Sequence, residues 1–465
     1  MTAPAAMPQT YSIVGLGKLG ASMAAAIASR GFDVIGVDIN QHAVDALNAG
    51  HAPVQETGLD ELVAANRCRL RATTSHRDAV LKSNVTFVIV PTPSDASGAF
   101  SLQYAAWAFG EIGAALAEKE TYHLVVLTST VLPGATRHGL LPVLEQRSGK
   151  RCGVDFGLCY GPEFIALGSV IRDFLNPDFT LVGEFDQSSG QRLEDAYAAI
   201  MPNRPPCQRM TLENAELTKI SVNAYVTTKI AFANMLADLC ERIPGGDVDA
   251  VSQALGLDAR IGRKYLTGAL GYGGPCFPRD NVALSYIAQA LGTRADLAET
   301  TDRVNRSLAG AVLDRIGVSI PRGTTVAVLG LAYKPFSHVI EASQGVFLAK
   351  ALSSHGARVV AHDPLGGAAA ALELKDHAVV LDSLQECLNQ ASITIVTTPD
   401  PAYQALGPDH FTAGGKSATV VDCWRLLKAK LSNHPRITYI AIGRSLSEAR
   451  NVERLAALWG APAGA

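Results

Sequence analysis

The chain has 465 residues, of which 48% are hydrophobic and 18% are charged, so we expect two or three domains with large cores. Its net charge of −3 excludes the basic surface that nucleic-acid or anionic-membrane partners require, and no apolar run approaches the roughly 18 residues of a membrane span. The eight cysteines form no Cys-x-x-Cys pair, and the start lacks a basic region followed by an apolar one. We therefore expect a cytoplasmic protein without structural zinc, a disulfide framework or a secretory signal.

A dinucleotide-binding pattern lies near the N-terminus. A predicted strand leads into Gly15-x-Gly17-x-x-Gly20, a helix follows, and a second strand ends about twenty residues later at Asp38. Such glycines allow a tight turn and close approach of a pyrophosphate to the helix N-terminus, while the acid binds ribose hydroxyls. A purely structural glycine turn is the alternative. Because a carboxylate repels a 2′-phosphate, Asp38 predicts NAD rather than NADP.

Polar residues follow the next predicted strands, at 85–90 and 123–128. Thr92 and Thr130 then fall at the edge where open α/β sheets bind ligands, although ordinary turn formation explains Thr92 equally well. Glu163 comes after a further predicted strand. Without a functional role, Glu163 would be an acidic residue in the first turn of a helix, beside a proline.

One long helix is predicted from Thr211 to Arg242, since this stretch has apolar residues at helical spacing and no internal Pro or Gly. It suits a spine between two domains. Glu216, Lys219 and Asn223 share one face, so the helix would project an amine and an amide together. The alternative is a solvated ion pair between Glu216 and Lys219.

The stretch Gly271-Tyr-Gly-Gly-Pro-Cys-Phe-Pro-Arg-Asp280 contains three glycines and two prolines, which predicts a tight, rigid loop rather than a helix or strand. Cys276 lies there beside Arg279 and Asp280, a setting that favours the nucleophilic thiolate. A single cysteine is more often a small buried apolar residue than a nucleophile. The charged pair next to the thiol favours a catalytic role for Cys276.

A second α/β unit starts at Pro321, with predicted strands at 325–330, 358–363, 392–397 and 418–422. It lacks Gly-x-Gly-x-x-Gly, so we expect its ligand to differ from a dinucleotide. The predicted fold is α/β, with two doubly wound Rossmann-like domains joined by a long central helix. The predicted segments are an NAD-binding domain at 1–208, a central helical dimerisation and catalytic segment at 209–320, and a nucleotide-sugar-binding domain at 321–465.

Taken in order, these motifs resemble the UDP-glucose/GDP-mannose dehydrogenase family of NAD-dependent nucleotide-sugar 6-dehydrogenases over nearly the whole chain. The matching stretches are the glycine turn, Ser129-Thr130-Val131, Pro162-Glu163-Phe164, Asn214-Ala-Glu-Leu-x-Lys219-x-x-x-Asn223, Arg260-Ile-Gly, the Cys276 stretch and Gly330-Leu-Ala-Tyr-Lys334-Pro. The resemblance implies four-electron oxidation of a UDP-glucose or UDP-N-acetylhexosamine type of substrate at C6, from alcohol to carboxylate, with no metal.

The resemblance also assigns roles to residues. Cys276 would carry the aldehyde as a thiohemiacetal and then a thioester. The supporting catalytic roles would be oxyanion stabilisation by Lys219 and Asn223, proton management by Asp280, and hydrolysis by Glu163 with Thr130. The cofactor contacts would be Gly15, Gly17, Gly20, Asp38, Thr92, Thr130 and Arg279. The substrate contacts would be Glu163, Lys219, Asn223, Arg260, Tyr272, Gly273 and Lys334. Arg260 would reach the sugar site of a neighbouring chain, which implies a homodimer or a higher homo-oligomer.

The chain departs from the family pattern at three places. Arg279 stands where lysine is common, Phe336-Ser-His-Val-Ile-Glu341 replaces an acidic pair and an arginine, and Trp424 interrupts the commoner Asp-x-Arg. The last two lie in the part that, by resemblance, holds the nucleotide sugar. Two alternatives stay open. One is a two-domain 3-hydroxyacid dehydrogenase, which does not need Cys276, and the other is a non-catalytic NAD-binding sensor.

Overall fold

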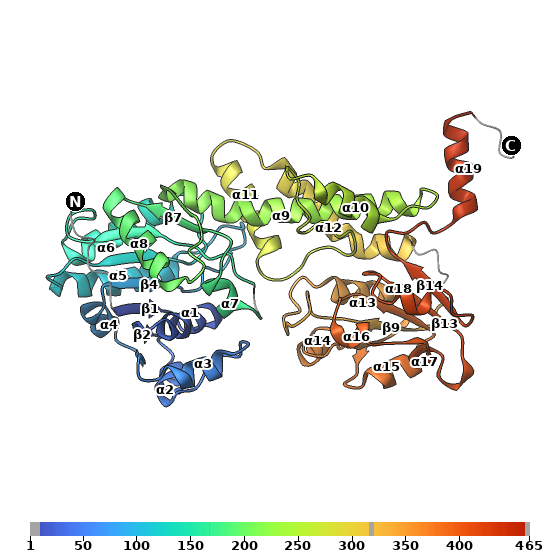
Figure 1. Cartoon of the computed structure of the whole chain (residues 1–465), viewed down its shortest axis with the longest axis horizontal. Helices are drawn as coiled ribbons and strands as arrows, with labels where there is room; N and C mark the ends of the chain where they lie inside the picture. Colours follow the sequence, from blue (N-terminus) through green and yellow to red (C-terminus); the bar gives the residue numbers. More distant parts are fainter. Residues whose placement is uncertain (1–9, 167, 316–319, 461–465) are drawn as a thin grey trace. The chain divides into compact units, whose positions relative to one another are not determined.

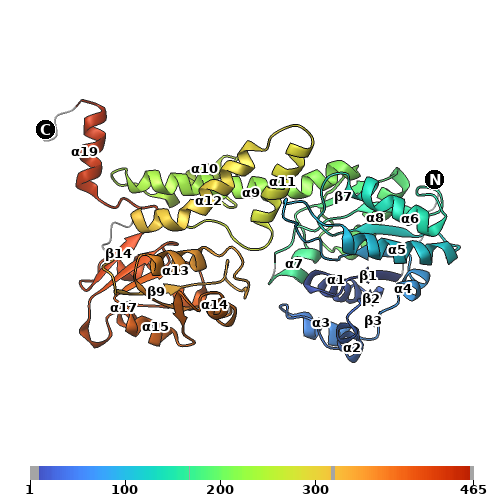
Figure 2. The same cartoon turned by 180° about the vertical axis from the view of Figure 1, so that it is seen from behind.

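Two α/β units make up the chain (Figures 1 and 2). The computed structural model describes residues 10–166, 168–315 and 320–460. The first unit runs to residue 222 and includes 289–291, and the second comprises 223–288 and 292–465. The helix α9 (Leu212–Glu241) begins in the first unit and ends in the second.

The first unit is built on an eight-stranded sheet with the order β3-β2-β1-β4-β5-β6-β7-β8, in which only the β6–β7 pair is antiparallel. Its strands are β1 (Thr10–Val14), β2 (Asp33–Val37), β3 (Leu70–Thr73), β4 (Val85–Val88), β5 (Leu124–Leu127), β6 (Gly157–Tyr160), β7 (Thr180–Glu184) and β8 (Cys207–Thr211). The central strands are continuous apolar runs because helices cover both faces of a parallel sheet.

The helices of this unit fall into two layers. One layer packs on the face that carries Tyr11 and Ile13 and consists of α1 (Lys18–Ser29), α2 (Gln41–Ala49), α3 (Leu59–Ala65), α7 (Val170–Leu175) and α8 (Gln187–Ile200). The other packs on the opposite face and consists of α4 (His76–Lys82), α5 (Gln103–Glu118), a π-helix (Ala135–Leu140) and α6 (Leu141–Ser148).

The second unit contains the C-terminal half of α9 and three further helices, α10 (Val248–Leu257), α11 (Phe277–Ala290, whose last two residues belong to the first unit) and α12 (Asp296–Arg315). Its six-stranded parallel sheet has the order β11-β10-β9-β12-β13-β14. The strands are β9 (Thr325–Leu329), β10 (Arg358–His362), β11 (Ala378–Val380), β12 (Ile393–Val396), β13 (Ala418–Asp422) and β14 (Ile437–Ala441).

Helices again cover both faces of this second sheet. One face packs against α13 (Gln344–Ser354) and α14 (Gly367–Glu373). The other packs against α15 (Leu384–Gln390), α16 (Pro401–Gln404), α17 (Pro408–Phe411) and α18 (Lys428–Leu431). A short 3-10 helix (Ala413–Gly415) precedes β13, and α19 (Glu448–Leu458) ends the described chain.

The predicted fold class and the predicted spine helix are confirmed, the helix to within one residue at each end. Five strands have no counterpart in the sequence prediction: β3, β7, β8, β11 and β14. Four of these, β3, β8, β11 and β14, are the edge strands of the two sheets. Some of their side chains face solvent, so these strands contain no continuous apolar run for the sequence to reveal.

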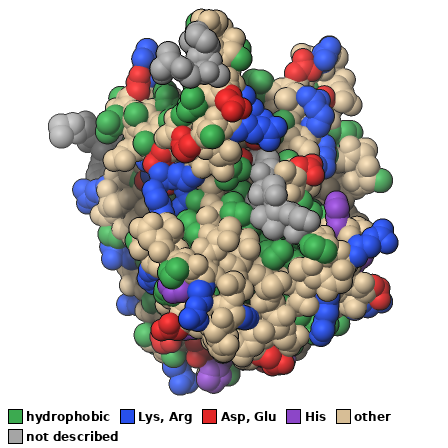
Figure 3. All heavy atoms as spheres, turned by 90° about the vertical axis from the view of Figure 1, so that its right-hand side faces the viewer, with side chains coloured by type: hydrophobic (Ala, Val, Ile, Leu, Met, Phe, Trp, Pro, Cys, Tyr) green, Lys and Arg blue, Asp and Glu red, His purple; other side chains and the backbone are tan. Residues whose placement is uncertain are grey.

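The surface agrees with the small net charge. Figure 3 shows Lys and Arg side chains interspersed with Asp and Glu on the face that it presents. Among the described residues, no helix combines the length and the apolarity that crossing a membrane requires.

Candidate active site

The three glycines of the N-terminal turn are required for different reasons. Gly15 has φ of 98°, and a Cβ there would overlap the Ile89 carbonyl oxygen. A Cβ at Gly20 would overlap the Gly15 carbonyl oxygen, so this glycine lets α1 pack close to β1. Gly17 has an ordinary φ of −69° and nothing within 4 Å of an added Cβ. The protein itself therefore does not need a glycine at 17, and open space at the N-terminus of α1 fits the approach of a pyrophosphate.

Asp38 closes the same turn from the end of β2. Its Oδ2 accepts the Leu16 N–H at 2.7 Å, and its Oδ1 accepts the Asn40 N–H at 2.8 Å. A carboxylate offers about four acceptor positions, so this half-exposed side chain retains capacity for two more donors. Two ribose hydroxyls are such donors, and the site therefore fits NAD.

Hydroxyl groups connect the loops that follow β4 and β5. Thr92 Oγ1 donates to the Thr130 carbonyl oxygen at 2.7 Å. Ser129 Oγ donates to the Val90 carbonyl oxygen at 2.7 Å and accepts the Val90 N–H at 2.9 Å. The turn-forming interpretation of Thr92 thus holds for its hydroxyl, and contact of Thr92 and Thr130 with the cofactor stays a prediction.

Glu163 and Lys219 meet within the first unit. Glu163 lies in a segment without regular secondary structure between β6 and α7, so the interpretation as a first-turn helix acid is wrong. The Lys219 Nζ donates to the Glu163 carbonyl oxygen and lies 4.6 Å from the centroid of the Phe164 ring. Although part of Glu163 is exposed, burial raises the pKa of its carboxyl to about 8, while the Lys219 charge opposes that rise. The carboxyl can therefore exchange a proton near neutral pH.

Glu216 does not form the solvated ion pair with Lys219 that was the alternative prediction from the sequence. Its side chain is fully buried, and Lys219 is buried as well. The Glu216 carboxylate accepts the Gly134 N–H at 2.5 Å and the Thr136 N–H at 2.8 Å, at the start of the π-helix. The sequence does not reveal this, because the partners lie about eighty residues away.

Cys276 is exposed and directly precedes α11 in the second unit. The Asp280 N–H donates to the Cys276 carbonyl oxygen at 2.9 Å, so the cysteine occupies the N-cap position. Residues 277–280 form the first turn of α11 rather than continuing the predicted loop, because proline is tolerated in a first turn. The unpaired N–H groups and the positive dipole end of a helix favour a thiolate over a thiol.

Three other predicted residues meet at the first turn of α11, in the same unit as Cys276. The Asn223 Nδ2 of α9 donates to Asp280 Oδ2 at 2.6 Å, and Asp280 is 1% exposed. The Arg279 Nε lies 3.5 Å from Asp280 Oδ1. A buried carboxylate held between an amide and a guanidinium is a fixed acceptor for a proton or a water molecule.

Buried amides hold the segment before the thiol, residues 271–276, which we call the Cys276 loop. Asn305 of α12 accepts the Tyr272 N–H at 2.8 Å and donates to the Tyr272 carbonyl oxygen at 2.9 Å. A Cβ at Gly271 would overlap the Asn305 Oδ1, which explains this glycine. Asn234 of α9 makes the same pair of bonds upstream, with the Ala269 N–H and the Leu270 carbonyl oxygen.

The Tyr272 side chain points into this network rather than toward solvent. Its hydroxyl donates to Asp302 and accepts from the Asn281 Nδ2 at 3.1 Å, and Tyr272 is 4% exposed. The tyrosine therefore anchors the loop, and its predicted contact with substrate finds no support in this geometry. Sequence reasoning missed Asn234, Asn281, Asp302 and Asn305. The signal for Asp302 and Asn305 was two polar residues three apart on the core-facing side of a helix.

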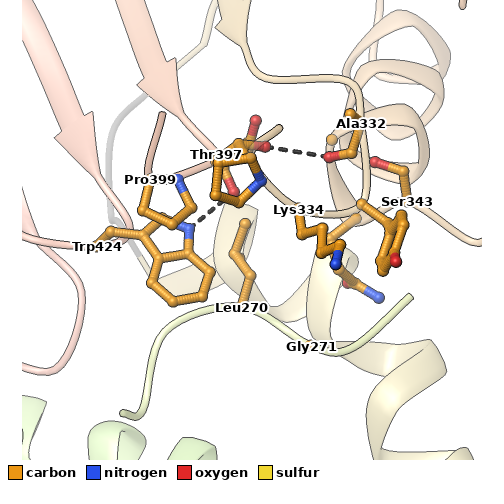
Figure 4. A pocket seen from close by; sticks show the side chains of 13 residues that line it. Leu270, Gly271, Ala332, Lys334, Ser343, Thr397, Pro399 and Trp424 are labelled. Atoms are coloured by element: carbon orange, nitrogen blue, oxygen red, sulfur yellow. Dashed lines mark hydrogen bonds between the residues drawn. The ribbon is translucent and has the colours of Figure 1, made fainter. Parts of the chain in front are cut away.

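A pocket opens at the ends of β9 and β12, where the order of the second sheet reverses (Figure 4). Lys334 and Gly271 line it, and the Trp424 ring covers one side with its Nε1 donating to the Thr397 carbonyl oxygen at 2.8 Å. Ser343 Oγ and Gln344 Oε1, at the N-terminus of α13, are buried without a hydrogen-bond partner in the described part of the chain. Buried polar atoms of this kind are ready to bind a polar ligand or water.

Known proteins match the chain along most of its length. Three domains of the UDP-glucose/GDP-mannose dehydrogenase family match it: the NAD binding domain at residues 9–201, the central domain at 213–307 and the UDP binding domain at 327–429. The chain belongs to the UDP-glucose/GDP-mannose dehydrogenase family. It is thus an NAD-dependent dehydrogenase of nucleotide sugars, and the predicted resemblance and cofactor are confirmed.

Relatives in this family differ in the nucleotide that their names give. The UDP-glucose 6-dehydrogenase AglM of Haloferax volcanii is 37% identical over 406 residues, which cover 86% of this chain and 94% of that protein. The GDP-mannose 6-dehydrogenase of Azotobacter vinelandii is 33% identical over 412 residues, covering 86% and 93%. The structure of a UDP-glucose dehydrogenase from Pyrobaculum islandicum superposes with a TM-score of 0.83 at 33% identity, covering 96% of this chain and all of that one.

The second unit of this dehydrogenase contains a modified copy of the dinucleotide turn. Gly330 has φ of 112°, and a Cβ at Gly345 would overlap the Gly330 carbonyl oxygen. A Cβ at Gly20 would overlap the Gly15 carbonyl oxygen in the same way. Asp363 occupies the position of Asp38, but its oxygens accept four backbone amides, from Leu331, Ala332, Leu365 and Gly366, at 2.6 to 3.0 Å. Its acceptor positions are filled, so it has no capacity left for ribose hydroxyls.

Two arginines of the dehydrogenase occupy contrasting environments. Arg260 is exposed and pairs with Asp258 at 2.6 Å, so its guanidinium is accessible, and its reach to a neighbouring chain stays a prediction. Arg425 is buried, pairs with Asp249 at 2.8 Å and donates to the Gly268 carbonyl oxygen at 2.9 Å. It holds the segment that leads to the Cys276 loop and is a structural residue.

Proposed function

We propose that the chain oxidises C6 of a UDP-sugar, of the UDP-glucose or UDP-N-acetylhexosamine type, from alcohol to carboxylate with Cys276 as nucleophile. The observation that carries this proposal is the exposed Cys276 at the N-cap of α11, whose first turn contains Asp280 in its buried pair with Asn223. A helix N-terminus favours the thiolate, and a fixed carboxylate next to it can take up a proton.

The reaction takes four electrons from the sugar. In the first half the C6 hydroxyl loses a proton and C6 loses a hydride, which gives an aldehyde. The Cys276 thiolate adds to the aldehyde carbon, and the thiohemiacetal loses a second hydride to give a thioester. Water then cleaves the thioester into the carboxylate and the free thiol. NAD held at the N-terminal turn would supply the hydride acceptor, one molecule for each half, which accounts for two NADH per sugar.

The thiol adduct explains why an enzyme of this type needs a cysteine. A free aldehyde in water is hydrated or lost, whereas a covalent adduct stays in the site between the two oxidations. Lys219 and Asn223 are four residues apart on α9, and we assign them to the oxyanion that forms on the C6 oxygen. The Asn223 amide has a second N–H beyond the one bound to Asp280. Such donors contribute about 3 to 4 kcal/mol of transition-state stabilisation.

The remaining protons are assigned to carboxyl groups. Asp280 accepts a proton through water, since its side chain is fixed by Asn223 and Arg279. Glu163 assists hydrolysis together with Thr130, because a carboxyl whose pKa is raised to about 8 exchanges protons readily at neutral pH. Arg279 contributes charge beside the cofactor.

For the nucleotide we propose the pocket of the second unit, with Lys334 neutralising the diphosphate. The domain matched at 327–429 is named a UDP binding domain in a family that also includes GDP-mannose dehydrogenases, so uridine is our proposal and the sugar panel below tests it. We further propose a homodimer, built by the central segment 209–320, in which Arg260 serves the sugar site of the partner. The eight cysteines are all free thiols, which favours a reducing cytoplasmic setting.

The test is the formation of NADH by the purified protein with a panel of UDP- and GDP-sugars. We expect turnover with a UDP-hexose, two NADH for each sugar consumed, and a uronic acid as product. One NADH per sugar would remove the cysteine mechanism. NAD binding without turnover on any sugar would make the protein a sensor rather than an enzyme.

A further inference from the structure

Two side chains at the start of α13 set the polarity of the pocket in the second unit. Ser343 Oγ and Gln344 Oε1 belong to residues of the pocket wall, and neither atom has a hydrogen-bond partner in the described part of the chain. Ser343 is 1% exposed and Gln344 is 6% exposed, so bulk water does not satisfy these atoms. A buried polar atom costs free energy unless it is paired. The partner of these two oxygens would be a molecule in the pocket.

Three other polar side chains of the pocket wall are bonded to the backbone (Figure 4). Thr397 Oγ1 donates to the Gly330 carbonyl oxygen at 2.6 Å, and Thr398 Oγ1 donates to the Ala332 carbonyl oxygen at 3.2 Å. The Trp424 Nε1 donates to the Thr397 carbonyl oxygen at 2.8 Å. The protons of these groups are therefore used by the fold, whereas the two oxygens at the start of α13 are not.

The orientation of the Gln344 amide follows from its contact with the Cys276 loop. The Gln344 Nε2 donates to the Tyr272 carbonyl oxygen at 3.3 Å, and a Cβ built on Gly271 would lie 3.0 Å from the same nitrogen. Turning the amide over would place two acceptor oxygens against each other, so the nitrogen faces the loop. The unpaired atom is therefore the oxygen, which acts only as an acceptor.

The acid of the second glycine turn does not provide such an acceptor. The Asp363 oxygens are filled by four backbone amides, whereas Asp38 of the first unit retains capacity for two more donors. Ribose hydroxyls and the ring N–H of a base are donors, and each needs an acceptor when it is buried. A phosphate offers only acceptor oxygens, which fit the Lys334 cation instead. The Gln344 oxygen suits the donor groups of a nucleotide.

We propose that the Gln344 amide oxygen accepts a hydrogen bond from a ribose hydroxyl or from the ring N–H of the bound nucleotide, which makes Gln344 a specificity-determining residue. The proposal rests on the assignment of the nucleotide to this pocket in the function proposed above. A nucleotide that lacks the donor leaves the Gln344 oxygen buried and unpaired, so it binds more weakly. The neighbouring Ser343 hydroxyl can donate or accept and is available to a second group of the same ligand.

The test combines one protein variant with changes in the ligand. Titration calorimetry measures the Kd of UDP, or of GDP if GDP binds more tightly, with the full chain and with Gln344→Met, which has a side chain of similar length without the amide. The 2′-deoxy and 3′-deoxy forms of this nucleotide test the ribose, and the form methylated at the ring N–H tests the base. We expect one of the three analogues to bind the native protein about 5- to 150-fold more weakly than the parent nucleotide.

Gln344→Met should bind the parent nucleotide more weakly and should no longer distinguish it from that analogue. A change in packing alone would weaken all the ligands by the same factor. For every analogue, a ratio of Kd values that is the same in native protein and Gln344→Met would therefore overturn the proposal. Gln390→Met is the matched control and should keep the native ratios, because Gln390 is exposed and precedes β12, at the edge of the sheet opposite the pocket.

Nucleotide binding does not require Cys276, so the outcomes of this test and of the sugar panel are separable. The expected ratios in a protein that oxidises no sugar would refute the proposed oxidation and leave this inference standing. Turnover of a nucleotide sugar with unchanged ratios would overturn this inference and leave the proposed oxidation standing. A native chain that binds neither UDP nor GDP would overturn both.

A second measurement applies if Gln344→Met does not fold. Labelling with carbon-13 glutamine and nitrogen-15 glycine identifies Gln344 in the native protein, because it is the only glutamine followed by glycine in the sequence. Its side-chain carbonyl resonance should move when the parent nucleotide is added and should move less with the analogue that lacks the donor. A resonance that responds equally to all four nucleotides, or to none, would overturn the proposal as well.

Discussion

Gly17→Ala separates ligand binding from folding at the N-terminal turn. An added Cβ has nothing within 4 Å, and φ of −69° suits any residue, so the folded chain accepts a methyl group there. Alanine lowers the entropy of the unfolded chain, which stabilises by about 0.4 to 1 kcal/mol. It is also a poorer N-cap, which costs a similar amount. The two effects nearly cancel, and we expect the free energy of unfolding to change by less than about 1 kcal/mol.

The same methyl group should weaken NAD binding strongly, because it fills the space through which the pyrophosphate approaches the amides of α1. Loss of one hydrogen bond to a charged group costs about 1.5 to 3 kcal/mol. That corresponds to roughly a 10- to 150-fold rise in Kd. Titration calorimetry with NAD measures this change, and thermal unfolding measures stability in the same preparations.

Two other glycines provide controls. Gly310→Ala lies on the exposed side of α12 with open space around it, and it should keep native NAD affinity with slightly higher stability. Gly20→Ala should destabilise the first unit by about 1 to 3 kcal/mol or more, because its Cβ overlaps a carbonyl oxygen. Native NAD affinity in folded Gly17→Ala would refute the assignment of this position to the cofactor, and a strongly destabilised Gly17→Ala would refute the packing argument.

Four further outcomes are expected. Cys276→Ser should be slow or stall in the second half of the reaction and release little acid, because a serine ester hydrolyses more slowly than a thioester. Native turnover by this variant, followed through NADH yield, would leave the thiol a packing role. Arg260→Ala should raise KM for the nucleotide sugar and leave thermal stability unchanged, because the side chain is exposed. Light scattering that shows a fully active monomer would contradict a sugar site shared between two chains. In the folded chain the pKa of Glu163 is raised to about 8 from an ordinary value of 4.5, so as pH rises the unfolded chain releases this proton first. The contribution of Glu163 to the free energy of unfolding should therefore fall between about pH 4.5 and about pH 8. Denaturant titrations across this range should show that Glu163→Gln removes this pH dependence of stability. Asn305→Ala leaves the Tyr272 N–H buried and unpaired, at about 1 to 3 kcal/mol, and leaves the Tyr272 carbonyl oxygen only the bond from Gln344 Nε2 at 3.3 Å. This variant should lower thermal stability and kcat together, whereas unchanged kcat would show that the loop needs no such clamp.

The sequence alone determined the features that depend on local spacing. Gly15, Gly17 and Gly20 lie within one turn, Asp38 follows at the end of the next strand, and α9 repeats apolar residues at helical intervals without a breaker. Continuous apolar strands predicted parallel sheets covered on both faces, and these form the two centres of the structure. Burial on a given face is encoded by periodicity, and periodicity is visible along the chain.

Only the tertiary structure decided where buried polar groups find their partners. Tyr272 binds Asn305, 33 residues away, and Lys219 binds the backbone of Glu163, 56 residues away. The second glycine turn was hidden because its two glycines, Gly330 and Gly345, are separated by residues 331–344. A polar side chain has the same sequence signature whether water or a distant amide satisfies it, so its role depends on which elements the fold brings together.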